Sequence, residues 1–194
     1  MSVALGDWAA VAVVVVLIVA WTLSYSAARL DRLHARVEGT LAALDAQLVR
    51  RAEATLELVN SGALDPASAL MLADAACESL ACAALEDTDH ERQAFTTERG
   101  SAESDLTEAL ELTLSPETVA QLRSDDDDLI EVALHRVSSA AARVQLARRF
   151  HNDAVTEARR VRRLYVVKLF RLAGHARMPQ TVEFADEAPG ALRP

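Results

Sequence analysis

Residues 130–165 read IEVALHRVSSAAARVQLARRFHNDAVTEARRVRRLY and carry the most regular apolar period in the chain. Small or apolar side chains, with one histidine among them, recur every three or four positions, as they do on one face of an α-helix. The series is Ile130, Ala133, Val137, Ala140, Val144, Ala147, His151, Ala154, Ala158, Val161 and Tyr165. Because its alanines let a neighbouring helix approach closely, the stretch predicts a long helix packed along the seam of a helical bundle.

A similar period precedes it and predicts a second long helix. Its members are Leu30, Leu33, Val37, Leu41, Leu44, Leu48, Leu56 and Val59. The spacing places them on one helix face, and Ser61-Gly62 ends the pattern. Since no breaker precedes it, this helix is expected to continue directly from the apolar segment before it.

Shorter helical stretches are expected between the two long ones. Asp65-Pro66 is a typical N-cap and first-turn proline for a helix whose apolar pattern ends near residue 87. A further helix is expected over residues 90–112, with Gly100-Ser101 weakening its middle. Ser115 is a cap for a short turn that follows.

The composition agrees with an all-helical chain. Glycine (6), proline (5) and aromatic residues (4%) are scarce, whereas alanine and leucine are abundant, which favours long helices over sheets. Short connections make successive helices antiparallel neighbours, so an antiparallel up-and-down bundle is expected. The net charge of −9 argues against a general nucleic-acid binder.

An uncharged apolar segment occupies residues 8–28. A helix of this length spans about 30 Å, the thickness of a bilayer's hydrocarbon core. Val15 and Leu17 lie in its apolar centre. Trp8 lies at one end and Trp21 and Tyr25 toward the other, as interfacial aromatic residues do. We therefore expect one transmembrane helix; the alternative is a cleaved signal peptide, for which the expected basic residues before the run are absent.

The flanking charges predict the orientation. No lysine or arginine precedes the segment, whereas Arg29, Arg32 and Arg36 follow it. Positive flanks stay cytoplasmic, so the N-terminus is expected outside and the body inside the cell. The expected organisation is a short extension (1–7), a single membrane-spanning helix (8–28), a helical bundle (29–174) and an irregular tail (175–194).

A basic and apolar segment ends the last helix. Its cationic residues are Arg159, Arg160, Arg162, Arg163, Lys168 and Arg171. Such a segment is typical of a contact with anionic lipid, and a solvated basic face is the alternative.

Cys77 and Cys82 would lie about 140° apart around a helix, so we expect two small buried residues and no disulfide between them.

Four segments resemble the LemA family. Residues 148–155 (RRFHNDAV) are similar to the A-R-x-x-Y-N-x-A-V signature of that family's last long helix, and residues 33–51 resemble its first helix. His90-Glu91 resembles its middle-helix H-E motif, and residues 179–184 its tail. Departures are an apparent insertion over residues 63–86 and the absence of the usual Pro-Ser-Asn loop. The resemblance implies an N-terminally anchored, antiparallel helical bundle without established enzymatic chemistry.

Within that motif, roles are expected for Arg148, Arg149, Phe150, His151, Asn152 and Asp153. Both arginines are expected to pair with acids on a neighbour, such as Glu38, Asp45 or Glu53. Asn152 and Asp153 are expected to contact either a neighbouring helix or a partner.

The sequence predicts a membrane-anchored scaffold or regulatory interaction protein with an unidentified protein partner, no cofactor and no catalytic site. One alternative is a self-assembling, membrane-organising protein that uses the same seams between copies. A metal-dependent enzyme is less favoured, because the five histidines are scattered. His135 and His151, for example, lie about 160° apart around one helix and do not converge on a metal. No glycine-rich phosphate loop and no G-x-S-x-G motif occur.

Overall fold

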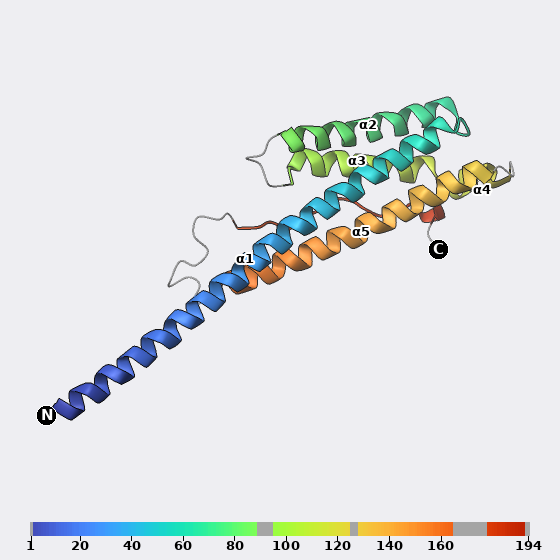
Figure 1. Cartoon of the computed structure of the whole chain (residues 1–194). Helices are drawn as coiled ribbons and strands as arrows, with labels where there is room; N and C mark the ends of the chain where they lie inside the picture. The colour runs from blue at the N-terminus through green and yellow to red at the C-terminus, as the bar shows by residue number, and fades with distance from the viewer. Residues whose placement is uncertain (1, 89–94, 125–127, 165–177, 193–194) are drawn as a thin grey trace. The chain divides into compact units, whose positions relative to one another are not determined.

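The computed structural model describes residues 2–88, 95–124, 128–164 and 178–192, and within these ranges all regular structure is helical. The helices are α1 (Ser2–Asn60), α2 (Pro66–Thr88), α3 (Thr97–Thr113), α4 (Pro116–Ser124) and α5 (Asp128–Arg162), followed by the short 3₁₀ helix η1 (Gly190–Leu192) (Figure 1). The predicted all-α fold is confirmed. The uncharged apolar segment of residues 8–28 and the first apolar period belong to one helix, because α1 is continuous from Ser2 to Asn60.

Polar side chains cap three of the helices. Asp65 Oδ1 accepts hydrogen bonds from the backbone N–H groups of Ala67 (3.0 Å) and Ser68 (3.1 Å), which opens α2. Ser115 Oγ accepts from the N–H of Thr118 at 3.1 Å and opens α4. The caps expected at Asp65 and Ser115 are thus confirmed, since each satisfies an N–H group that the first helical turn leaves unpaired.

The start of α3 differs from the prediction. The helix begins at Thr97 instead of residue 90, and the Thr96 side chain caps it by accepting from the N–H of Arg99 at 3.1 Å. Gly100 therefore lies in the first turn, where a glycine disturbs a helix less than in the middle. His90-Glu91 lies outside the described residues.

Contacts divide the chain into two compact units, the first of which combines Met1–Glu38 with Asp153–Pro179. Here α1 and the end of α5 lie side by side (Figure 1). Val37 of α1 packs on Ala154, Val155 and Ala158, and Leu30 packs on Val161. An exposed ion pair between Arg29 and Glu157 (3.2 Å) accompanies this apolar contact.

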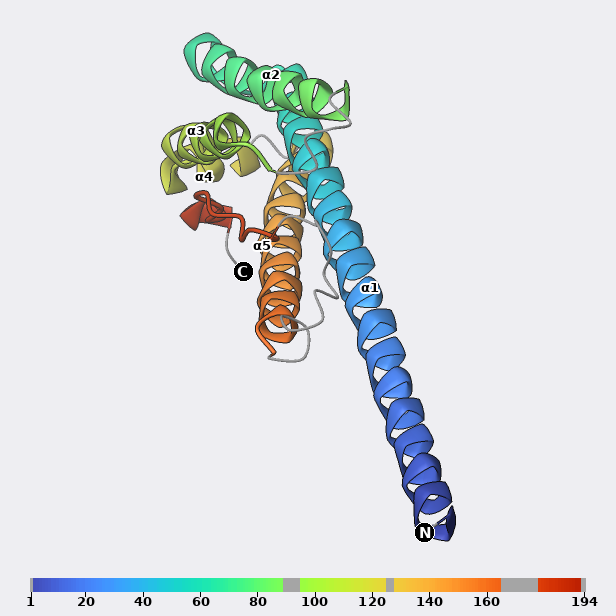
Figure 2. The ribbon, with the colours of Figure 1, turned by 90° about the vertical axis from the view of Figure 1, so that its left-hand side faces the viewer.

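The second unit combines Gly39–Asn152 with Gln180–Pro194. Its main core takes apolar residues from every helix and from η1: Ala52, Ala54, Leu58, Leu72, Ala76, Leu106, Leu110, Val119, Leu122, Ile130, Leu134, Val137 and Leu192, among others. Within it, α2 lies next to α3 (Figure 2), and the two helices run in opposite directions (Figure 1). A smaller cluster joins Leu44 and Leu48 of α1 to Val144 of α5 and to Val182 of the C-terminal segment.

The apolar period of α5 is confirmed as its packing face. Ile130, Ala133, Val137, Ala140, Val144, His151, Ala154, Ala158 and Val161 are all buried, and Ala147 is half-buried. Tyr165 lies outside the described residues. Along the whole described length of α5, the spacing of three and four therefore marks the residues that face a neighbour.

The expected burial of Cys77 is wrong. Its side chain is exposed and that of Cys82 is half-buried, and the two form no disulfide. The reason is that α2 turns Leu72, Ala76 and Ser79 toward the core, which leaves Cys77 on an outer face.

Candidate functional site

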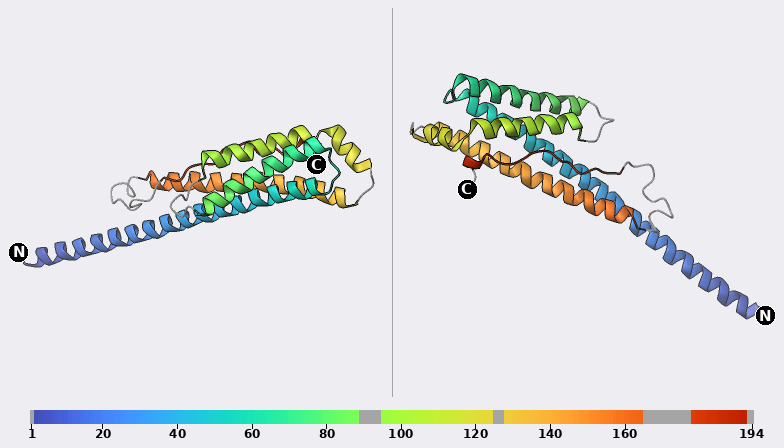
Figure 3. Two further views of the ribbon diagram at one scale, coloured as in Figure 1. Left: turned by 90° about the horizontal axis from the view of Figure 1, so that it is seen from above. Right: turned by 180° about the vertical axis from the view of Figure 1, so that it is seen from behind.

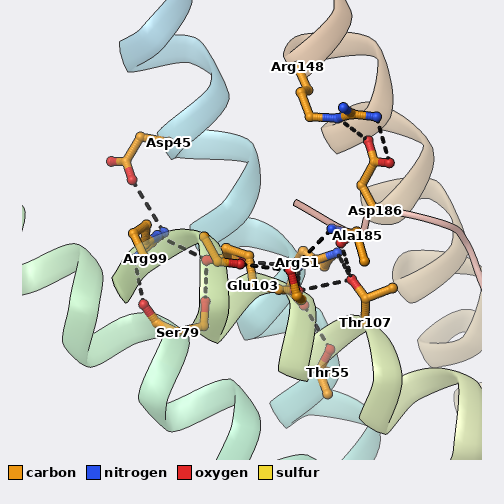
Figure 4. A network of polar contacts seen from close by, with 12 residues as sticks. Asp45, Arg51, Thr55, Ser79, Arg99, Glu103, Thr107, Arg148, Ala185 and Asp186 are labelled. Atoms are coloured by element: carbon orange, nitrogen blue, oxygen red, sulfur yellow. Dashed lines mark hydrogen bonds and ion pairs between the residues drawn. The ribbon is translucent and has the colours of Figure 1, made fainter. Parts of the chain in front are cut away.

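A buried ion pair joins α1 to α3. Arg51 Nη2 lies 2.7 Å from Glu103 Oε2, and both side chains are at most 1% exposed (Figure 4). The same nitrogen donates to the Glu103 carbonyl oxygen at 2.8 Å. An arginine is suited to this place, because its planar guanidinium donates several hydrogen bonds in fixed directions.

The other Glu103 oxygen extends the network to α2. Ser79 Oγ donates to Glu103 Oε1 at 2.7 Å, and Arg99 Nε lies 3.0 Å from the same oxygen. Arg99 is fully buried, donates to the Ser79 carbonyl at 2.5 Å and faces Asp45 Oδ1 at 3.3 Å. Side chains and backbone groups of α1, α2 and α3 are thereby joined in one buried polar network.

The network holds more positive than negative charge in its interior. Two guanidinium groups, Arg51 and Arg99, share the buried carboxylate of Glu103, while Asp45 is half exposed. Burial lowers the pKa of Arg51, and the negative charges of Glu103 and then Asp186 oppose this effect. The C-terminal segment thus supplies part of the compensating charge.

One hydroxyl group connects the network to that segment. Thr107 Oγ1 accepts from Arg51 Nη1 at 2.8 Å and donates to the carbonyl oxygen of Ala185 at 2.7 Å. Figure 4 shows this link between the guanidinium group and the C-terminal backbone. The Thr107 hydroxyl therefore bridges the backbone of the segment and a buried guanidinium group.

Side chains of two helices hold the backbone of the C-terminal segment, which runs between α3 and α5 (Figure 3). We name these residues the tail-binding surface: Ser104 and Thr107 of α3, and Gln145, Arg148 and Asn152 of α5. Ser104 Oγ accepts from the N–H of Ala185 at 3.1 Å, and Gln145 Nε2 donates to the carbonyl of Asp186 at 2.7 Å.

Asn152 makes the most complete of these backbone contacts. Its Nδ2 donates to the Val182 carbonyl at 3.0 Å, and its Oδ1 accepts from the Val182 N–H at 2.9 Å. An amide side chain thus replaces a neighbouring strand, since it satisfies both backbone groups of one residue.

Arg148 contacts two side chains of the C-terminal segment, those of Asp186 and Phe184. It binds Asp186 through two parallel hydrogen bonds, Nε to Oδ2 at 2.7 Å and Nη2 to Oδ1 at 2.8 Å. Its guanidinium carbon lies 5.7 Å from the centre of the Phe184 ring, which itself stacks on Phe95 at 5.6 Å. Paired charge-assisted bonds of this kind are short, strong and specific in geometry.

Burial alternates along the segment. Val182 and Asp186 are buried and Phe184 is half-buried, whereas Glu183, Ala185 and Glu187 are exposed. This period of two is typical of an extended chain with one face against a surface. The segment therefore turns Val182, Phe184 and Asp186 toward the tail-binding surface.

The expected partners of Arg148 are wrong. Arg148 pairs with Asp186 of the C-terminal segment, and Asp45 binds Arg99. Helical periodicity directs attention to neighbouring helices and gives no signal for an extended segment that lies between them. Arg149, Phe150 and Asp153 are exposed, whereas His151 is buried with Nδ1 3.2 Å from Thr40 Oγ1.

Most of the residues predicted to contact the membrane or lipid lie in the part of the chain that the structure describes, and their exposure can be compared with the prediction. Trp8, Val15, Leu17, Trp21 and Tyr25 are all exposed. In the basic segment, Arg160 and Arg163 are exposed and Arg162 is half-buried. Arg159 Nε donates to the carbonyl of Pro179 at 2.8 Å, while Lys168 and Arg171 lie outside the described residues.

The flanking arginines are exposed as well. Arg29 pairs with Glu157, Arg32 Nε donates to the Ala28 carbonyl at 3.2 Å, and Arg36 faces solvent. These contacts involve exposed groups and contribute little to stability.

Sequence reasoning missed Arg51, Arg99, Glu103 and Asp186. A signal for two of them exists: Arg51 continues the spacing of Leu44 and Leu48, and Glu103 precedes Leu106 and Leu110 at the same spacing. A charged residue at an apolar position of a helical period is expected to have a buried partner. Asp186 has no such signal.

Comparisons of the chain with protein-family models, with curated proteins and with solved structures find no match. Two helical stretches among the described residues, Ala12–Asn60 and Pro66–Leu85, are long and apolar enough to cross a membrane by length and composition. Among those same residues no group of three or more His, Cys, Asp or Glu is placed to hold a metal ion.

Proposed function

We propose that the protein is a membrane-anchored helical scaffold or regulatory interaction module. The observation that carries this proposal is the exposed apolar segment of α1, in which Val13 to Val19 and the flanking Trp8 and Trp21 are exposed. Burying a side chain of this size contributes about 1.5–3 kcal/mol, so a run of them in water is unfavourable. A bilayer supplies the missing apolar surroundings.

Residues 8–28 are favoured over α2 as the membrane span. In α2, Asp74 and Glu78 are exposed in the middle of the apolar stretch, and Ser79 donates to the buried Glu103. A charged side chain at a bilayer centre costs about 2.5–3.5 kcal/mol on insertion scales. We therefore assign α2 to the body of the protein and a single span to α1, with the later helices forming an up-and-down bundle.

The proposed orientation places the body in the cytoplasm. It is supported by Arg29, Arg32 and Arg36, which follow the span directly, and by two cysteines that form no disulfide, Cys77 and Cys82. Lipid contact of the basic segment that begins at Arg159 remains part of this proposal.

Membership of a divergent branch of the LemA family is also proposed. Two segments that carry the resemblance, residues 148–155 and 179–184, are in contact through the hydrogen bonds between Asn152 and Val182. A third, residues 33–51, contributes Arg51 to the buried network. Two of the segments on which the resemblance rests thus lie against each other in the fold, and this contact is what the proposal of membership takes from the structure.

The chain's own Cys77 tests the anchor and its orientation. Intact cells and inverted membrane vesicles are treated with a membrane-impermeant maleimide, with Cys77→Ser as the control that removes the exposed thiol. Labelling of Cys77 only in inverted vesicles is expected. Labelling in intact cells would place the body outside, and recovery of the protein in the soluble fraction would overturn the anchor.

Cross-linking in the native membrane followed by purification then tests the interaction role. A reproducible cross-linked partner protein is expected. Recovery of the chain without any cross-linked protein contradicts that role.

A further inference from the structure

The contact between α1 and α5 has an exposed edge at which positions of the two helices face each other. Glu57 of α1 and Arg136 of α5 form an ion pair there, with Arg136 Nη1 2.6 Å from Glu57 Oε2. Positions one heptad apart lie on the same face of a packed helix, and in an antiparallel pair the second helix is followed in the reverse direction. The next facing positions are therefore Arg50 of α1 and Arg143 of α5.

Neighbouring core residues agree with this register. Leu48 and Val144, which lie beside these two positions in the sequence, belong to one buried cluster. Arg50 and Arg143 are both exposed, and neither side chain has an ion pair or hydrogen bond to another described residue. Opposite charges at such an edge stabilise a helix pair and like charges destabilise it. Two unmatched guanidinium groups are therefore suited to carboxylates from outside the chain.

Apolar side chains continue the same edge. Leu146 and Phe150 follow Arg143 at helical spacing and are 51% and 54% exposed. On α1, exposed alanines precede Arg50 at the same spacing. We name the following residues the outer seam: Ala43, Ala46, Arg50, Arg143, Leu146 and Phe150.

The outer seam and the tail-binding surface use different residues of α5. Gln145, Arg148 and Asn152 hold the C-terminal segment, whereas Leu146 and Phe150 face solvent among the described residues. The chain's own tail therefore leaves these two apolar side chains uncovered.

We propose that the outer seam docks an acidic amphipathic helix of a partner protein. Its carboxylates bind Arg50 and Arg143, and its apolar face covers Leu146 and Phe150, as when a helix lies along an apolar surface. Charge complementarity selects this partner, because unmatched arginines attract acids and repel basic segments. A free phosphate matches the arginines but leaves two large apolar side chains in water. The proposal deepens the proposed interaction role, on which it rests.

A synthetic amphipathic helix tests the docking. Its leucines recur every three or four residues with glutamates beside them, and a second peptide carries lysines in place of the glutamates. Fluorescence anisotropy measures binding of each peptide to the full-length chain in detergent. The glutamate peptide is expected to bind more than about tenfold more tightly. Because the chain has a net charge of −9, unspecific attraction would give the opposite order. No binding, equal binding or tighter binding of the lysine peptide overturns the proposal.

Arg143→Glu separates docking from folding. The change places an acid opposite Arg50, as Glu57 lies opposite Arg136, so the helix pair should not lose stability. Affinity for the glutamate peptide is expected to fall more than about tenfold. Arg149→Glu, at an exposed position outside the outer seam, is the matched control and should change the affinity by no more than about twofold. Equal effects of the two changes, in chains with the same unfolding midpoint, overturn the proposal.

A photoreactive residue at Ala46 then identifies what occupies the outer seam in the native membrane. The expected cross-link joins a helical segment of another protein with acids beside an apolar face, and Arg143→Glu is expected to abolish it. A cross-link to lipid, to a basic segment or to another copy of the chain overturns the proposal. A partner that cross-links only elsewhere on the chain overturns the outer seam and leaves the interaction role intact. Failure of the membrane anchor is distinct, because the peptide measurements are made in detergent.

Discussion

Asn152 binds both backbone polar groups of Val182, which lies 30 residues further along the chain. A buried backbone N–H or C=O without a partner is unfavourable, and here one side chain satisfies both. This relationship explains how a segment with no strand beside it follows a defined path.

Asn152→Asp is expected to loosen the C-terminal segment without unfolding the helices. The new carboxylate accepts from the Val182 N–H but repels its carbonyl oxygen. Losing one buried hydrogen bond costs about 1–3 kcal/mol, so the Val182 amide should exchange with solvent roughly tenfold to a hundredfold faster. Hydrogen exchange followed by mass spectrometry measures this. Asp153→Asn, at the exposed next position, should change nothing, and equal exchange in both variants would contradict the role given to Asn152.

Glu103→Gln is expected to destabilise the whole second unit. The change leaves Arg51 and Arg99 buried without their shared negative charge, and breaking such a pair costs about 3–5 kcal/mol. Denaturant unfolding followed by circular dichroism measures the loss. Glu108→Gln removes an exposed carboxylate from the same helix and should shift the free energy of unfolding by no more than about 0.5 kcal/mol. Similar effects from both changes would mean that the network adds nothing.

Thr107→Val is expected to affect both the buried network and the tail. Valine keeps the shape of threonine but leaves Arg51 Nη1 and the Ala185 carbonyl each without a bond, at a cost of about 1–3 kcal/mol. Lower unfolding free energy and faster proteolysis near Ala185 should appear together. Thr107→Ser retains the hydroxyl and should restore tail protection. Loss of stability with an unchanged tail would show that the two are not coupled.

Asp65 is expected to make the stability of α2 depend on pH. Hydrogen bonds from the Ser68 side chain, and then from its backbone N–H, lower the pKa of this carboxyl below its ordinary value of 3.8. A depressed folded-state pKa stabilises the protein above about pH 4, and this contribution is lost as the pH falls through the folded value. Asp65→Asn keeps the cap but cannot titrate. Below pH 4 the difference in thermal stability between wild type and Asp65→Asn should therefore change in favour of the variant, and a constant difference would contradict the assignment.

Local patterns determined the helical elements. Repeats of three and four residues identified α1 and α5, because a helix turns the same side chains to one face whatever surrounds it. The caps at Asp65 and Ser115 were equally predictable, since capping depends on residues only two or three positions away. The start of α3 was not, because Thr96 competes with several other polar residues as a cap.

The candidate site depended on tertiary structure. Arg51, Ser79 and Glu103 lie on three different helices, and the contact of Arg148 with Asp186 crosses 38 residues. No periodicity relates such positions, and burial alone decides which charges require a partner. The sequence by itself therefore determined which segments become helices and which face of each is apolar. Only the packing of those helices decided where an extended C-terminal segment lies, and thereby that Asp186 supplies negative charge to Arg148 and Arg51.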